Sequence, residues 1–170
     1  MLYLNLNNIT IIGASLGGML APRAAAFNKE IKRVIAWSVF TDFSEIILDN
    51  CPQRLVKIIK FMMKIKAYFI INSLFNFLIK HGKNEKVKWG ILHGMYAYDA
   101  KTPCGYIRKL KKFQTLDIGK LIYQDVLILS ANKDNFINYH RINDEIDEFT
   151  NAKSFTFRLL TNKQSAGVQL

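Results

Sequence analysis

A serine flanked by glycines carries the clearest chemical signal in the chain. Gly13-Ala14-Ser15-Leu16-Gly17 fits the pattern G-x-S-x-G, in which a serine on a sharp turn between a strand and a helix attacks a carbonyl carbon. A strained turn of this kind leaves no room for a Cβ atom two residues to either side, so glycine is expected at both Gly13 and Gly17. The backbone N–H of Leu16 would then stabilise the oxyanion that forms during the attack.

An aspartate further along the chain has the position of the acid that such a serine needs. Asp134 follows the apolar run Val126–Ser130, which predicts a buried strand. A short loop at the end of that strand could bring the carboxylate beneath an imidazole, where it would orient a general base. An exposed aspartate ahead of the next helix is the simpler alternative, and the serine motif favours the catalytic interpretation.

The base itself is expected to be missing from this chain. In the order serine, acid, histidine, the histidine follows the last strand, but residues 161–170 contain none. His81 and His93 precede the acid, and His140 falls on a predicted helix that would point it away from the serine. The sequence therefore predicts a nucleophile and an acid without their base.

A glycine-rich nucleotide loop is the rival interpretation of the same segment. "GASLGG" also looks like the dinucleotide turn of short-chain dehydrogenases. However, Met19 occupies the third glycine position, none of the seven tyrosines has a lysine four residues later, and no lysine follows the glycines to bind phosphate. The serine turn is therefore favoured, and we expect neither a cofactor nor a metal.

Composition limits the class of protein further. The chain has 170 residues, half of them apolar, as is typical of one globular unit. Cys51 and Cys104 lie far apart and predict neither a disulfide nor a zinc site, so a reducing cytoplasmic location is expected. The net charge of +11 would suit a nucleic-acid partner. The lysines, however, are spread along the chain without a recognised nucleic-acid-binding motif, so no such partner is expected.

The elements that must position these residues alternate between strands and helices. The apolar runs are nearly continuous, which is typical of a parallel sheet covered on both faces. The fold class is therefore α/β, with parallel strands, flanking helices and an inserted helical layer. The expected strands are 8–13, 31–43, 123–136 and 153–160, and the expected helices are 16–30 and 137–149. The expected divisions of the chain are a core part over 1–43, the helical insertion over 44–120 and a second core part over 121–170.

Three segments that cover nearly the whole chain resemble a known family. They are "IIGASLGGMLAPRAAAFNKEIKRVIAWSVFTDF", "WGILHGMYAYDAKTPCGYIRKL" and "QTLDIGKLIYQDVLILSANKDNFI". They are similar to the α/β-hydrolase superfamily, of the prolyl-oligopeptidase-like or esterase type with a helical cap. The resemblance implies that Ser15 is the nucleophile, Leu16 the second oxyanion donor and Asp134 the acid.

The same resemblance implies an incomplete hydrolase. The four predicted strands look like the second half of the family's sheet, so the chain is expected to be truncated at both ends. Strand 9–12 would then be an apolar sheet edge, which predicts self-association. The expected reaction is acyl transfer on an ester, thioester or amide of a small molecule; the alternative is a non-catalytic remnant or interaction module of the same fold.

The helical insertion contains an aromatic cluster with one histidine. Trp89, His93, Met95, Tyr96 and Tyr98 are expected mostly to form the core of the cap. His93 could instead contact a substrate.

A lysine stripe in the same insertion has two interpretations. The longest apolar stretch, Leu55–Lys80, is interrupted by lysines, and its uncharged part is shorter than the ~18–20 residues of a membrane-spanning helix, so no membrane span is expected. The favoured interpretation buries Phe61, Ile65 and Phe69 against an acyl pocket and leaves the lysines in solvent. The alternative is a helix that lies on an anionic membrane surface.

Overall fold

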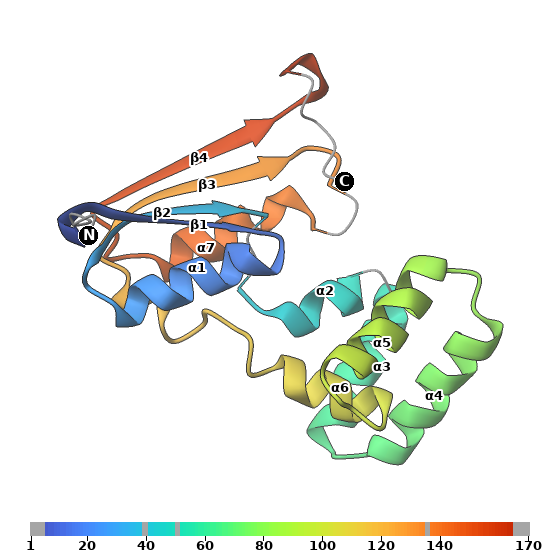
Figure 1. Ribbon diagram of the computed structural model, residues 1–170. Helices are drawn as coiled ribbons and strands as arrows, with labels where there is room; N and C mark the ends of the chain where they lie inside the picture. The colour runs from blue at the N-terminus through green and yellow to red at the C-terminus, as the bar shows by residue number, and fades with distance from the viewer. Residues whose placement is uncertain (1–5, 39–40, 50–51, 135–136, 165–170) are drawn as a thin grey trace, which may run out of the picture. The chain divides into compact units, whose positions relative to one another are not determined.

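Four parallel strands form one sheet whose spatial order follows the chain order (Figure 1). They are β1 (Ile9–Ala14), β2 (Ile31–Trp37), β3 (Asp125–Ala131) and β4 (Ser154–Leu160). Gly13 lies opposite Ala36, which in turn lies opposite Ile128. Because all four strands run in the same direction, the residues that follow them gather at one edge of the sheet. The predicted parallel α/β arrangement is confirmed.

The computed structural model describes residues 6–38, 41–49, 52–134 and 137–164. The chain divides into two compact units. The first consists of residues 1–41 and 114–170 and contains the sheet, and the second consists of residues 42–113 and is helical.

One face of the sheet packs against two helices of the first unit. Figure 1 shows α1 (Leu16–Phe27) and α7 (Ile142–Glu148) on the same side of the strands. Small side chains of α1 let the helix approach closely, and Ala21 and Ala25 are buried against Val34 and Ala36 of β2. The described part of this unit also contains four short 3₁₀ turns: η1 (Leu6–Asn8), η2 (Gly119–Leu121), η3 (Tyr139–Arg141) and η4 (Asn162–Gln164).

The opposite face of the sheet corrects one expectation. Ile12 is 70% exposed on β1, and Thr10 beside it on the same face is also exposed. Within the described part of this unit, the expected covering of both faces is therefore not found. β1 is also an edge of the described sheet, and self-association through it stays a prediction.

The predicted bounds of two strands and two helices were wrong. β3 covers Asp125–Ala131 rather than 123–136. β2 ends at Trp37 rather than Phe43, because Ser38 adopts a positive φ of 61° that turns the chain out of the strand. The helix predicted to end at Glu30 ends at Phe27. The helix predicted over 137–149 is divided into η3 and the shorter α7.

The second unit is a group of amphipathic helices around its own core. They are α2 (Phe43–Asp49), α3 (Gln53–Lys64), α4 (Tyr68–His81), α5 (Glu85–Ala97) and α6 (Pro103–Leu110). Its core includes Ile59, Ile71, Phe75 and Ile91. None of the helices in the described ranges is long and apolar enough to cross a membrane.

Side-chain caps fix where two of these helices begin. The Asn84 side chain accepts a hydrogen bond from the Val87 N–H at 3.2 Å, and Thr102 accepts one from the Gly105 N–H at 3.1 Å. Cys104, near the start of α6, is a buried free thiol, whereas Cys51 lies outside the described residues.

A carboxyl group is buried in the first unit without a hydrogen-bond partner. Glu145 of α7 is 0% exposed, and neither of its carboxyl oxygens has a partner among the described residues. Burial raises the pKa of Glu145 from 4.5 to about 8, and the negative charges of Asp144 and Glu148 act in the same direction. The side chain is therefore mostly protonated at neutral pH.

We predict that Glu145 makes the chain less stable as the pH rises. Between pH 4.5 and about 8 the unfolded state releases this proton while the folded state keeps it, so the free energy of unfolding falls by up to about 1.4 kcal/mol per pH unit. Urea unfolding of Glu145→Gln should show a smaller loss over this range. Asp147→Asn, an exposed change on the same helix, should keep the original slope, and an unchanged slope in Glu145→Gln would contradict the prediction.

Candidate active site

The backbone of Ser15 forms a sharp turn at the carboxyl end of β1. Ser15 has φ 53° and ψ −122°, a conformation that a residue with a side chain rarely adopts and that costs about 1–3 kcal/mol. Its N–H donates to the Trp37 carbonyl at 3.1 Å, and its carbonyl accepts from the Gly18 N–H at 2.8 Å. The Ser15 side chain is exposed at the edge of the sheet.

The tight packing around this turn involves Gly13 and Gly18. A Cβ atom at Gly13 would collide with the carbonyl of Gly17, and one at Gly18 would lie 2.6 Å from the Trp37 carbonyl oxygen and 2.8 Å from that of Ser38. By contrast, a Cβ at Gly17 would meet no described atom within 4 Å. The expected lack of space at Gly17 was therefore wrong. Gly18, which the sequence argument missed, is the second position with no room for a side chain.

Leu16 begins α1 directly after Ser15. The first N–H groups of a helix have no intrahelical partner, and the helix dipole places partial positive charge there. The Leu16 amide is therefore in a position to donate to an anionic oxygen, and its role as oxyanion donor stays a prediction.

Asp134 is held by a side chain from the neighbouring strand. The Ser38 hydroxyl, directly after β2, donates to Asp134 Oδ2 at 2.8 Å, and the Ile137 N–H donates to Asp134 Oδ1 at 3.0 Å. Ser38 is 1% exposed, and its own N–H donates to the Leu129 carbonyl at 2.9 Å. The loop is also tied to the last strand, because the Asn132 N–H donates to the Leu160 carbonyl at 3.0 Å.

Ser38 is a residue of the site that the sequence argument did not identify. Its only sequence signal is a polar residue at the end of an otherwise apolar run, which many strands share. The structure places the ends of three successive strands together, with Ser15 after β1, Ser38 after β2 and Asp134 after β3.

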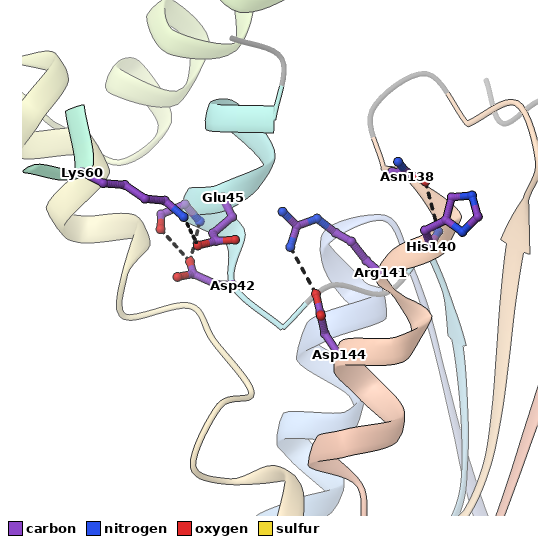
Figure 2. A network of polar contacts seen from close by, with 8 residues as sticks. Asp42, Glu45, Lys60, Asn138, His140, Arg141 and Asp144 are labelled. Carbon is purple, nitrogen blue, oxygen red and sulfur yellow. Dashed lines mark hydrogen bonds and ion pairs between the residues drawn. The ribbon is translucent and has the colours of Figure 1, made fainter. Parts of the chain in front are cut away.

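The three histidines lie elsewhere in the chain. His140 is exposed in η3, where its backbone N–H donates to the Asn138 side-chain oxygen at 3.0 Å (Figure 2). Its ring centroid is 4.2 Å from that of Tyr139. The predicted helical setting of His140 is thus replaced by a 3₁₀ turn. His81 and His93 belong to the second unit, on α4 and α5.

His93 forms a stacked pair rather than part of a core. Its ring is nearly parallel to that of Trp89, with an interplanar angle of 7° and a centroid distance of 4.8 Å. Trp89 is 58% exposed, Tyr96 is 88% exposed and His93 is exposed as well. The expectation that these three form the cap core was wrong, whereas Met95 does pack against the buried cluster.

We predict that the two glycines of the motif respond differently to alanine. Gly13→Ala should lower the free energy of unfolding by about 1–3 kcal/mol, because the new Cβ collides with the Gly17 carbonyl and lies 2.8 Å from Ala21 Cβ. Gly17→Ala should be neutral or slightly stabilising, since its Cβ enters open space and alanine favours a helix. Urea unfolding of the matched variants measures both, and equal stability of the two would contradict the prediction.

We also predict a measurable coupling between Ser38 and Asp134. In a double-mutant cycle of Ser38→Ala and Asp134→Asn, urea unfolding should give an interaction free energy of about 1–3 kcal/mol, because the hydroxyl donates to a partly buried carboxylate. The same cycle with exposed Asp147→Asn in place of Asp134→Asn should give additive effects. Additivity of both cycles would show that the 2.8 Å hydrogen bond does not stabilise the fold.

Comparison with known proteins identifies the fold. No family model matches the sequence. A curated protein, hydrolase LUC6 of a Fusarium species, is 28% identical over 116 residues, which cover 67% of this chain and 26% of that protein. The chain therefore matches about a quarter of the length of this relative.

Solved structures share the arrangement of strands and helices at low sequence identity. The α/β hydrolase GrgF from Penicillium sp. sh18 has a TM-score of 0.53 at 12% identity, over 92% of this chain and 56% of that one. Est1E from Butyrivibrio proteoclasticus gives 0.51 at 15% identity over 91% and 51%, and the Pyrococcus furiosus esterase Pf2001 gives 0.50 at 12% over 94% and 46%. The chain spans about half the length of these proteins, and its four parallel strands and their helices have the α/β-hydrolase fold.

Proposed function

We propose that the chain is part of a serine hydrolase that acts by acyl transfer on an ester, thioester or amide. The observation that carries the proposal is the strained backbone of Ser15, φ 53° and ψ −122°, at the turn from β1 into α1. Strain of this size persists only where the surrounding structure holds it, and it concentrates at functional sites. A carboxylate held at the same sheet edge supports the proposal further.

In the proposed reaction, Ser15 Oγ attacks the carbonyl carbon while a base takes its proton. The carbonyl oxygen becomes an oxyanion, which the Leu16 N–H stabilises. The intermediate collapses to an acyl-serine as the base returns the proton to the leaving group. Water, activated by the same base, then hydrolyses the acyl-serine and regenerates Ser15.

Asp134 has the role of the acid that orients the base. The Ser38 hydroxyl and the Ile137 N–H each donate to one oxygen of its carboxylate, which fixes the direction of the side chain. We propose that the base is a histidine outside the 170 residues of this sequence. The chain by itself is then inactive.

The substrate is proposed to be a small-molecule acyl compound, and the helical unit offers one candidate contact for it. Its stacked pair, Trp89 and His93, presents an exposed aromatic face, and His93 is proposed to contact the substrate. The solved neighbours include the Pyrococcus furiosus esterase and a Mycobacterium tuberculosis peptidase that hydrolyses puromycin, which has a TM-score of 0.50 at 11% identity over 89% of this chain and 18% of that one. Ester and amide substrates are therefore the classes to test first.

A serine-directed fluorophosphonate probe tests the proposal. Sequencing the source transcript beyond both ends of the reading frame defines the longest polypeptide that contains these residues. In a polypeptide extended to include a downstream histidine, the probe should label Ser15, and Ser15→Ala should abolish the labelling. In the 170-residue chain, labelling should stay at the level of Ser15→Ala, because the base is missing.

Two matched variants test whether labelling depends on the activation of Ser15 rather than on how accessible a serine is to the probe. Ser73→Ala, at an exposed serine of α4, should leave the labelling unchanged, whereas Asp134→Asn should lower it by at least ten-fold. If the transcript encodes no further histidine, or if Ser15 stays unlabelled in the extended polypeptide, the chain is a non-catalytic remnant of the fold and the proposal fails.

A further inference from the structure

Large apolar side chains are exposed at one end of the hairpin formed by α3 and α4. Ile58 and Phe61 of α3 are 47% and 62% exposed, Ile65 after the helix is 56% exposed, and Phe69 at the start of α4 is 82% exposed. Ile58, Phe61 and Ile65 follow one another at spacings of three and four residues, so they share one helix face. This structure contradicts the expectation that Phe61, Ile65 and Phe69 are buried against a pocket.

These side chains are not the packing face of α3. The buried residues of that helix are Val56 and Ile59, which pack against Ile71 and Phe75 of α4. The outward face is therefore additional to what the core of the second unit needs. Exposed apolar groups of this size in one place are typical of an interaction surface.

The charged residues of the hairpin itself all have the same sign. Residues 50–84 contain seven lysines and arginines and no aspartate or glutamate. Lys60 is paired with Glu45 at 2.8 Å (Figure 2). Lys57 and Lys64 are exposed on α3, four residues before and three residues after Phe61, so they share its side of the helix. Lys66 lies in the turn between α3 and α4, with a φ of 58°.

We infer that this end of the hairpin binds peripherally to an anionic lipid surface. Phe61, Ile65 and Phe69 enter the boundary between headgroups and acyl chains, and Lys57, Lys64 and Lys66 approach the lipid phosphates. A helix that combines exposed aromatic and aliphatic side chains with lysines and no acidic residue has the composition of an interfacial helix. Lysine suits this partner because its point charge interacts with many phosphates without a fixed geometry.

A lipid surface fits these observations better than an acidic protein does. Side chains that project around a turn insert into a fluid boundary without a complementary pocket, whereas a protein partner must supply one for each aromatic group. Lys57, Lys64 and Lys66, in a segment without acidic residues, also match a surface whose charge is spread over many headgroups. The inference does not depend on the chemistry proposed for Ser15.

Co-sedimentation of the 170-residue chain with vesicles tests the inference. The chain should bind phosphatidylcholine vesicles that contain phosphatidylglycerol, bind pure phosphatidylcholine much more weakly, and dissociate as salt rises. Phe69→Ser should weaken binding about ten-fold, because a large apolar group no longer leaves water. Lys64→Gln and Lys66→Gln should each weaken it about five-fold.

Matched controls lie elsewhere on the same unit. Tyr96→Ser removes an aromatic side chain that is 88% exposed on α5, and Lys101→Gln removes an exposed charge between α5 and α6. Both should bind like the unchanged chain, and far-ultraviolet circular dichroism should show that every variant is folded.

Several outcomes would overturn the inference. They are the absence of vesicle binding, equal binding to neutral and anionic vesicles, or equal losses in the Tyr96 and Phe69 variants. Sedimentation velocity without lipid gives a further one: if Phe69→Ser abolishes a dimer while the vesicle affinity is unchanged, the surface is an interface between two copies of the chain. Displacement from vesicles by an acidic polypeptide at equal charge concentration would assign the surface to a protein partner.

Discussion

The backbone turn at Ser15 is the constraint on which the arrangement of the candidate site depends. A residue with a side chain is held at φ 53°, and the turn closes because Gly13 and Gly18 let the start of α1 approach β1 and the end of β2. The contacts at Gly18 involve the Trp37 and Ser38 carbonyls. The conformation of the candidate nucleophile and the end of the neighbouring strand are therefore determined together.

The local part of this arrangement could be predicted from the sequence. A β-branched run, a serine between glycines and a stretch of small residues are adjacent in the chain, so their pattern alone indicates strand, turn and helix. The contact between Ser38 and Asp134 could not be predicted in this way, because it joins residues 96 positions apart. It depends on where β2 ends and on its register with β3, which local patterns determine poorly.

The same limit explains the errors in the helical unit. An amphipathic pattern shows that a helix has an apolar face, but α3 has apolar residues on two sides. Val56 and Ile59 are buried, while Ile58 and Phe61 are exposed. Aromatic composition was a similarly poor guide on α5, where Trp89 and Tyr96 are exposed and the smaller Ile91 is buried. Which face packs is decided by neighbouring helices that local periodicity does not describe.

Two hydrogen bonds orient the carboxylate of Asp134, the candidate acid, and both come from described residues other than histidine. Ser38 holds one carboxylate oxygen and the Ile137 amide holds the other, so the carboxylate is oriented by groups within its own chain. A base that arrives from outside these residues would meet a carboxylate that is already oriented. The direction of this carboxylate is thus set within the first unit.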